Sequence, residues 1–426
     1  MSLITAVEEC GGVGAERAAP LPFDVAVKVA IGAALPTGGA ELAPLHASIG
    51  RILASDINSP LCLPLFDHSA MDGYAVRTID LNGSGPWMLE MRHRILAGDP
   101  PASIPVVGTC VEIYTGAPVP EGFDAVVIRE RCVVAGDTVL ITGSARVGEN
   151  IRRRGEDISE GMKVASSGQP VTTHVAAMLA ALGVGSVQVR TRVRVALLTT
   201  GSELVRTGEV LLPGQIYDSN SVMAAATLSL PWIELSDLGH IPDDLGAITE
   251  AVRDASQNYD VILTSGGMSH GAADHMRAAL AENGARLDVM QVAMRPGKPA
   301  TIGRLGNALF IGLPGNPMAA AVVLRQIALP AIRKTAGFQK VESGWIRAVA
   351  SFEYRKREGR TEFVPVRIAG TDASGRPLLE ILGRGSSGSL LPMAISDGVA
   401  MLGSEDAEIH RGQELRFEPF HITDGF

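Results

Sequence analysis

The chain has 426 residues, of which 46% are hydrophobic and 19% charged, so it is long enough for about three globular domains and too apolar for a disordered chain. Its formal net charge of -9 argues against a general nucleic-acid binder, because affinity for a phosphate backbone needs a basic surface. The four cysteines, Cys10, Cys62, Cys110 and Cys132, are widely spaced and predict neither a disulfide framework nor a zinc site.

The sequence predicts a cytoplasmic protein with no membrane partner. Residues 1–14 contain Glu8 and Glu9 and lack a basic start followed by an apolar core, so we expect no signal peptide. The most apolar helical stretch, 318–332, contains Arg325 and is too short to span a bilayer. Widely spaced cysteines fit a reducing compartment.

The first part of the chain predicts a helical domain interrupted by a β unit. Apolar residues at helical spacing predict a helix at 22–35. A second helix is predicted at 172–182, capped by Thr172 or Thr173 and stopped at Gly183. Between them, short apolar runs separated by Gly, Pro, Asn and Asp predict a compact β unit. Its expected strands are 87–91, 110–114, 125–128 and 139–141. We therefore predict a mixed N-terminal domain at 20–66 plus 145–190, carrying an inserted β domain at 67–144.

From residue 191 onward, strands and helices alternate. Expected strands are 193–198, 232–238, 261–263, 286–292 and 308–311, and expected helices are 220–230, 243–258, 272–283 and 317–332. This alternation predicts βαβ units and a mostly parallel sheet covered on both faces, over residues 191–335. Strands then predicted at 346–352, 362–368, 378–382 and 414–417 indicate a C-terminal β domain at 340–426.

Glycine-rich loops at the ends of three predicted strands indicate a ligand site. In an open α/β sheet the site lies at the C-terminal ends of the strands, where small residues let the backbone approach an anion. No G-x-G-x-x-G follows the strand expected at 193–198, and Gly297-Lys298 lacks the upstream glycine and the following Ser/Thr of a P-loop, which argues against a Rossmann dinucleotide site and a Walker ATPase. The candidate binding residues are Ser202, Ser265, Gly266, Gly267, Pro314, Gly315, Asn316 and Pro317.

Acidic residues accompany these loops. Glu203 and Asp274 lie within them and are candidates to hold Mg²⁺ against a phosphate, since Mg²⁺ takes few carboxylates plus phosphate oxygens. Capping of the following helix is the simpler interpretation of Asp243 and Asp244.

Two groups of basic residues stand out. Arg295 and Lys298 lie on a turn that Pro296 and Pro299 stiffen. A fixed pair of cations of this kind predicts an oxyanion site. The three arginines at 152–154 fit either a solvated face or interdomain ion pairs. His270 and His275 lack a third ligand at metal-binding spacing, so we interpret them as surface or supporting histidines.

Together these motifs resemble the molybdopterin molybdenumtransferases of the MoeA/gephyrin type. They follow one another in the order of that family between about residues 20 and 335. They are FDHSAMDGYA (66–75), TGAPVP (115–120), GED (155–157), TGSEL (200–204), SGG (265–267), RPGKP (295–299) and GLPGNP (312–317).

The resemblance implies a multidomain α/β protein. It comprises a central three-layer α/β molybdopterin-binding domain, a mixed helical N-terminal domain with an inserted β domain, and a C-terminal β-barrel-like domain. It also implies an elongated homodimer and a reaction in which adenylylated molybdopterin and molybdate give molybdenum cofactor and AMP, with Mg²⁺. A molybdopterin-adenylyltransferase and apo-molybdoenzymes are the implied protein partners.

Carried over motif by motif, the resemblance also implies roles for individual residues. Asp67 and Thr115 would reach the cleft from the β domain, and Glu203, Asp243 and Asp274 would serve the phosphate and Mg²⁺. Molybdate would be held by Arg295, Lys298 and Pro299, and the pterin pocket would be shaped by Pro314 and Pro317. Arg360 would lie on the molybdate side with Ser386, or with Ser387 or Ser389 in its place.

The chain departs from the family pattern at several positions. His68 stands where the family usually has Asn, Ala319 where many members have Ser, and Arg295 where Lys is common. Ala319 and a poor match over 383–397 keep a non-catalytic molybdopterin carrier or scaffold open as an alternative. A hydrolase acting on a nucleotide-like pyrophosphate is a third possible function.

Overall fold

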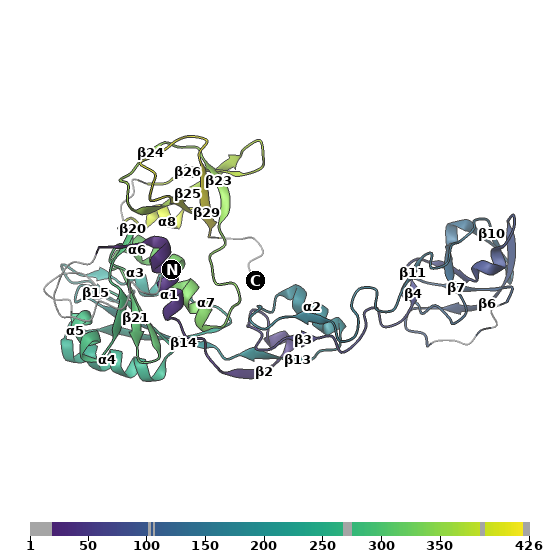
Figure 1. Ribbon diagram of the computed structural model, residues 1–426, viewed down its shortest axis with the longest axis horizontal. Helices are drawn as coiled ribbons and strands as arrows, with labels where there is room; N and C mark the ends of the chain where they lie inside the picture. Colours follow the sequence, from purple (N-terminus) through teal and green to yellow (C-terminus); the bar gives the residue numbers. More distant parts are fainter. Residues whose placement is uncertain (1–18, 101–103, 105–106, 267–274, 384–387, 421–426) are drawn as a thin grey trace, which may run out of the picture.

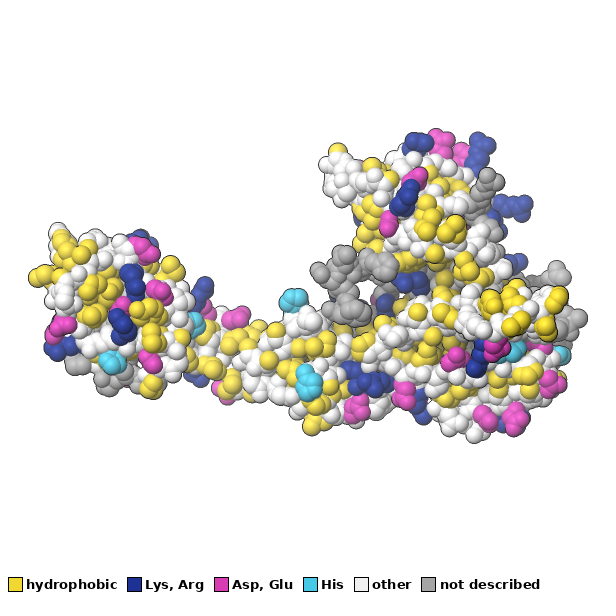
Figure 2. All heavy atoms as spheres, turned by 180° about the vertical axis from the view of Figure 1, so that it is seen from behind, with side chains coloured by type: hydrophobic (Ala, Val, Ile, Leu, Met, Phe, Trp, Pro, Cys, Tyr) yellow, Lys and Arg dark blue, Asp and Glu magenta, His cyan; other side chains and the backbone are white. Residues whose placement is uncertain are grey.

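The computed structural model describes residues 19–100, 104, 107–266, 275–383 and 388–420, and it is elongated (Figure 1). An α/β unit and a C-terminal β-barrel lie together at one end, and a narrow arm carries a second β unit away from them. Figure 2 shows the same arm from behind, with charged side chains of both signs on the β unit. No helix in the described ranges is long and apolar enough to cross a membrane. The predicted multidomain α/β architecture is confirmed.

A six-stranded sheet in the order β17-β14-β18-β22-β21-β19 forms the centre of the α/β unit. The first four strands run parallel, whereas β21 and β19 pair antiparallel, so the sheet is mostly parallel as predicted. The strands are β14 (Val193–Thr200), β17 (Ile233–Ile241), β18 (Val261–Ser265), β19 (Arg286–Val289), β21 (Thr301–Leu305) and β22 (Ala308–Leu313). The sequence prediction missed β21, a short strand with Gly303 at its centre.

Helices cover both faces of this sheet. Alternate residues of β14 enter different cores: Val195 and Leu197 belong to one cluster, and Ala196 and Leu198 to the other. Helices α3 (Ser219–Thr227), α6 (Pro317–Val323) and α7 (Leu329–Thr335) pack on the first face, and α4 (Leu245–Asn258) and α5 (His275–Glu282) on the second. A strand buried on both faces accounts for its nearly continuous apolar sequence.

Two elements predicted as continuous are divided in the structure. The helix expected at 317–332 consists of α6, a π-helical turn at Leu324–Ala328, and α7. Pro330 has no N–H for the carbonyl four residues earlier, and the turn before it widens accordingly. The strand expected at 286–292 ends at Val289, because the chain then leaves the sheet and β20 (Val292–Arg295) pairs with the barrel instead.

Helix α1 (Phe23–Ala33) packs on the α/β unit although it precedes the arm in sequence. Ala26 and Ala30 are buried in the same core cluster as β14 and α7. Before α1, β1 (Leu21–Pro22) pairs with β20. Packing therefore places α1 with the α/β unit, whereas the range 20–66 groups it with the arm. The domain ranges themselves stay a prediction.

Paired outgoing and returning segments build the arm. Strand β2 (Ala40–Pro44) pairs with β13 (Ser186–Arg190), and β3 (Ile57–Asn58) pairs with β12 (Lys163–Ala165). Helix α2 (Thr173–Ala181) covers them, and Thr172 Oγ1 accepts a hydrogen bond from Val175 N at 3.2 Å. The predicted N-cap is therefore confirmed.

At the far end of the arm lies a six-stranded sheet in the order β8-β5-β7-β6-β10-β9. Gly73 at the start of β5 is required by close packing, because a Cβ there would lie 2.0 Å from Val127 O. The strands are β5 (Gly73–Val76), β6 (Trp87–Ile95), β7 (Thr109–Ile113), β8 (Ala125–Ile128), β9 (Cys132–Ala135) and β10 (Thr138–Ile141).

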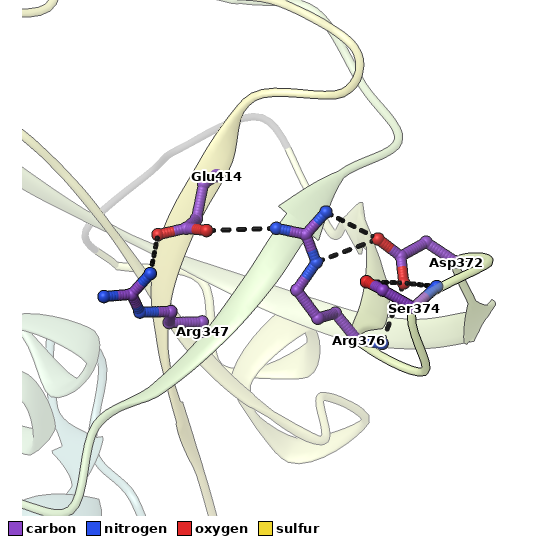
Figure 3. Close-up of polar contacts among 5 residues, drawn as sticks. All are labelled: Arg347, Asp372, Ser374, Arg376 and Glu414. Atoms are coloured by element: carbon purple, nitrogen blue, oxygen red, sulfur yellow. Dashed lines mark hydrogen bonds and ion pairs between the residues drawn. The ribbon is translucent and has the colours of Figure 1, made fainter.

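Five strands of the C-terminal domain form a closed barrel. Strand β25 pairs with both β26 and β27, which closes the ring through β23 and β29. The strands are β23 (Ile346–Ala350), β25 (Thr361–Thr371), β26 (Pro377–Ile381), β27 (Gly398–Leu402) and β29 (Glu414–Pro419). Figure 3 shows ion pairs across its surface, where Arg376 bridges Asp372 (2.8 Å) and Glu414 (3.0 Å). The barrel was predicted, but β27 was not.

Burial in the β unit predicts an order of cysteine reactivity. Burial raises the pKa of Cys110 to about 12 and that of Cys132 to about 11, while Cys62 on the arm is half-buried. Both thiols therefore stay protonated at about pH 8.5, and only the thiolate reacts readily. We expect iodoacetamide to modify Cys62 before Cys110 and Cys132, as measured by peptide mass spectrometry. Equal rates in the native protein would contradict the packing of this unit, and equal rates in denaturant are the control.

Candidate functional site

The C-terminal ends of β14, β18 and β22 bring three loops together in the α/β unit. Asn220 Nδ2, near the start of α3, donates to Ser265 Oγ (2.9 Å) and to Gly315 O (2.8 Å), and so joins the loops after β18 and β22. Gly266 has a φ of +90°, and a Cβ there would lie 2.2 Å from Thr200 O. Only glycine permits this approach, which places the loops after β14 and β18 in contact.

Unsatisfied polar atoms mark the same edge of the sheet. Thr200 Oγ1, Thr264 Oγ1, Asn220 Oδ1 and His240 Nδ1 are buried and have no hydrogen-bond partner within the described part of the chain. Buried polar groups in proteins are nearly always hydrogen-bonded. A group of exceptions at the C-terminal ends of parallel strands therefore indicates a ligand-binding edge.

Two carboxylates lie at this edge. Ser202 N donates to Asp243 Oδ2 at 2.8 Å, which joins the loop after β14 to the loop after β17. The carboxylate of Glu203 folds over Gly201, where a Cβ would lie 2.7 Å from Glu203 Oε2. Helix capping is correct for Asp244, which accepts from Ala247 N at 2.9 Å, but the observed partner of Asp243 is the Ser202 loop.

These two carboxylates suit a Mg²⁺ ion that also binds substrate phosphate, because Mg²⁺ takes one or two carboxylates plus phosphate oxygens. In the part of the chain that the structure describes, no group of three or more His, Cys, Asp and Glu side chains is arranged to hold a metal by itself. Gly267, His270, Asp274, Ser386 and Ser387 lie outside the described residues.

A second charged cluster lies where the α/β unit meets the barrel. Strands β20 and β25 pair so that Arg295 stands opposite Glu362, whose side chain is only 1% exposed. Glu362 Oε1 accepts from Arg360 Nε at 3.0 Å, while Oε2 accepts from Tyr354 Oη at 3.2 Å and from Arg295 Nη1 at 3.5 Å. Burial, and then the charge of Glu362, raise the pKa of Tyr354.

Glu362 was missing from the predicted site residues. Its signal in the sequence was an acidic residue inside the strand expected at 362–368, two positions after Arg360. The side chains of Arg295 and Arg360 are 41% and 34% exposed. The structure thus holds two arginines from different units on one buried carboxylate, with part of each guanidinium open to solvent.

The remaining loop residues shape the surroundings of these clusters. Lys298 is exposed, and its carbonyl oxygen accepts a hydrogen bond from Val292 N at 2.8 Å. This bond closes the loop 292–298, and Pro299 is the next residue. Pro317 is the first residue of α6, and Pro314 is buried before it. The departure at Ala319 falls on a buried position of α6 and not on the loop surface.

Asp67 directly precedes β4 (His68–Ser69) and Thr115 follows β7, and both strands lie at the far end of the arm, away from the α/β unit (Figure 1). Their loops are joined by hydrogen bonds from Val119 N to Asp67 O (2.9 Å) and from Gly116 N to Ser69 O (2.8 Å). A single chain therefore brings Asp67 and Thr115 near each other but does not bring them to the α/β edge.

Asp67 is held as a carboxylate by the arginine run. Burial raises its pKa, but hydrogen bonds from Arg154 N (2.8 Å) and Arg153 Nη1 (2.6 Å) outweigh this and keep the pKa below the ordinary value. Arg152 pairs with Glu156 at 3.2 Å. Arg153 thus pairs with Asp67 across the boundary between the predicted ranges 145–190 and 67–144, which favours interdomain ion pairs for this residue. Arg152 pairs locally, and Arg154 contributes its backbone N–H.

The fold and these clusters define a multidomain protein whose α/β domain carries a ligand-binding edge at the C-terminal ends of its parallel strands. Sequence models of three family regions match the chain: the MoeA N-terminal region (domain I and II) at 21–183, a probable molybdopterin binding domain at 196–334, and the MoeA C-terminal region (domain IV) at 347–420. The chain belongs to the MoeA family of molybdopterin molybdenumtransferases.

Relatives and solved structures agree with this assignment. The chain is 35% identical to the molybdopterin molybdenumtransferase of Haemophilus influenzae, over 89% of this chain and 94% of that protein. It is 34% identical to molybdopterin molybdenumtransferase 2 of Mycobacterium tuberculosis, over 88% and 93%. A crystal structure of the MoeA protein of Pyrococcus horikoshii superimposes with a TM-score of 0.81 at 25% identity, covering 94% of this chain and all of that one.

The Glu362 cluster predicts a specific stability effect. Glu362→Ala leaves Arg295 and Arg360 without their shared counter-charge and Tyr354 without its acceptor. We expect the free energy of unfolding to fall by about 1–3 kcal/mol, because the guanidinium groups stay partly solvated. Urea denaturation measures this change.

The matched control for that measurement is Glu380→Ala. Glu380 forms an exposed pair with Arg367 at 2.7 Å on the same barrel, and such pairs contribute at most about 1 kcal/mol. Equal effects of the two substitutions would contradict the role assigned to the buried carboxylate.

Proposed function

We propose that this protein is a molybdopterin molybdenumtransferase: it inserts molybdate into adenylylated molybdopterin and releases AMP, giving molybdenum cofactor. The observation that carries the proposal is the presence of two sites, one an unsatisfied polar edge on the α/β sheet and the other an arginine cluster at the barrel. The first suits a pterin and its phosphates, and the second suits a tetrahedral oxyanion.

The arginine cluster and Lys298 are proposed to bind molybdate. Arg360 engages Glu362 through Nε, so its two Nη groups are not used in that bond. Guanidinium groups bind oxyanions through two parallel N–H donors, and Arg295 adds this capacity where many family members have Lys. Lys298 supplies a further positive charge on the loop closed by Val292.

The α/β edge is proposed to bind the adenylylated pterin. Ser202, Ser265, Gly266 and Gly315 provide hydroxyls and close backbone, and Asn316 and Pro317 continue this surface into the start of α6, after the buried Pro314. Glu203 and Asp243 would hold Mg²⁺, together with Asp274 from the loop outside the described residues. The ion would neutralise phosphate charge, while the N–H of Ser202 keeps Asp243 oriented.

A second copy of the chain is proposed to complete the site. Asp67 and Thr115 adjoin β4 and β7, which lie at the end of the arm, away from the α/β unit of the same chain (Figure 1). An elongated homodimer would let the β unit of one copy reach the edge of the other. We further propose a cytoplasmic protein that receives its substrate from a molybdopterin-adenylyltransferase and delivers cofactor to apo-molybdoenzymes.

A turnover assay tests the proposed reaction. Purified protein given adenylylated molybdopterin, molybdate and Mg²⁺ is expected to release AMP, measured by chromatography, and to require both molybdate and Mg²⁺. Tight pterin binding without AMP would favour the carrier or scaffold function. AMP release in the absence of molybdate would favour a pyrophosphate hydrolase.

Lys298→Ala tests the oxyanion site within that reaction. Loss of a charge-assisted interaction is expected to raise the molybdate concentration for half-maximal AMP release about tenfold, with a smaller effect on the KM for the pterin substrate. Lys163→Ala, which removes an exposed lysine paired with Asp56 on the arm, is the matched control. An unchanged molybdate dependence would remove Lys298 from the site.

A further inference from the structure

The β unit contains a long-range carboxylate contact to the predicted site residue Thr115. Asp72 Oδ1 accepts two hydrogen bonds from Thr115, one from its backbone N at 2.8 Å and one from its hydroxyl Oγ1 at 2.9 Å. The two residues are separated by 43 positions in the chain. One carboxylate oxygen therefore fixes both the backbone and the side chain of Thr115.

The polarity of the hydroxyl contact follows from the charge of Asp72. Hydrogen bonds from the Thr115 backbone and then from its side chain lower the pKa of Asp72, against a small opposing effect of burial. An ionised carboxylate can only accept, so the single proton of Thr115 Oγ1 must point at Asp72. The exposed Thr115 hydroxyl then presents only lone pairs to any other group.

The surrounding backbone holds this pair from both sides. Arg129 N donates to Asp72 O at 3.1 Å, and Gly116 N donates to Ser69 O at 2.8 Å. In β7, which precedes Thr115 in the chain, the buried carboxylate of Glu112 accepts from Arg94 Nε (2.6 Å), Arg129 Nη2 (2.9 Å) and Tyr114 Oη (3.1 Å). Backbone hydrogen bonds therefore fix the two loops that carry Asp72 and Thr115.

Asp372 and Ser374 on the barrel form a chemically similar pair between residues that are close in the chain. Asp372 Oδ1 accepts from Ser374 N (2.9 Å) and Ser374 Oγ (2.8 Å), as Figure 3 shows. That pair spans two residues and shapes a hairpin turn between β25 and β26. The Asp72–Thr115 pair instead joins separate loops beside a predicted catalytic residue.

We infer that Asp72 is a positioning residue that makes the Thr115 hydroxyl an obligate hydrogen-bond acceptor for an N–H group of the substrate. This inference rests on the proposed function, in which Thr115 reaches a second copy's cleft. Adenylylated molybdopterin carries N–H donors on both of its ring systems. A substrate N–H fits better than a metal ion, because no cluster of metal-ligating carboxylates accompanies Thr115 among the described residues.

A double-mutant cycle tests this role. Asp72→Ala releases the hydroxyl proton to rotate, and Thr115→Val removes the hydroxyl. Each is expected to weaken equilibrium binding of adenylylated molybdopterin about tenfold, measured without molybdate, and to raise KM more than it lowers kcat. In the Thr115→Val background, Asp72→Ala is expected to cause no further loss, because its effect acts through that hydroxyl.

Three further variants keep the test decisive. Thr115→Ser, which keeps the hydroxyl, is expected to retain affinity within about threefold, and Asp72→Asn, which keeps an acceptor but no charge, to fall between wild type and Asp72→Ala. Asp372→Asn, the matched control on the barrel, is expected to leave binding unchanged.

Additive losses in the cycle would overturn the inference, as would an effect of Asp72→Ala on the Mg²⁺ requirement alone. Because binding is measured without turnover, the inference is separable from the reaction. Non-additive binding losses in a protein that releases no AMP would retain the role of Asp72 and refute the proposed activity.

Discussion

The buried carboxylate of Glu362 joins two parts of the molecule that the chain builds separately. Strand β20 leaves the α/β sheet to pair with β25, and this pairing sets Arg295 opposite Glu362. A carboxylate that is 1% exposed would be costly without partners, and Arg295, Arg360 and Tyr354 supply them. The same contacts hold two cations at fixed positions, so the stability of the junction and the proposed oxyanion site have one physical origin.

This local arrangement resolves the conflict between the overall charge and the proposed ligands. The protein has a net charge of -9, which disfavours anions in general. At the junction, two guanidinium groups share one carboxylate and Lys298 lies on the neighbouring loop, so the local balance is positive. Selective binding of a small oxyanion needs only this local field, because screening confines it to within about 10 Å.

The arm imposes a second constraint. The paired strands β2–β13 and β3–β12 hold the β unit away from the α/β edge, so Asp67 and Thr115 cannot serve that edge within one chain (Figure 1). Their loops are nevertheless tightly organised, by Arg153 and Arg154 at Asp67 and by Asp72 at Thr115. Such order at the tip of an arm is consistent with a surface built to meet a second copy.

The sequence by itself determined the local structure and the chemistry of the loops. After residue 191, apolar strands alternate with helices in the sequence, and this pattern predicted a mostly parallel sheet, because strands buried on both faces must be apolar throughout. Small residues marked the loops at the ends of these strands. The motif residues also carried the family resemblance, which the comparisons confirmed. These features depend on near neighbours in the chain and are visible without a fold.

Only the tertiary structure decided which distant residues meet. Glu362 meets Arg295, which lies 67 residues away in the chain, and Asp72 meets Thr115, which lies 43 residues away, and no local pattern in the sequence predicts either contact. The tertiary structure likewise decided that β20 pairs with the barrel and that α1 packs on the α/β core. Pairing across such separations is set by the packing of whole units and the desolvation of buried charge, and neither leaves a periodic pattern in the sequence.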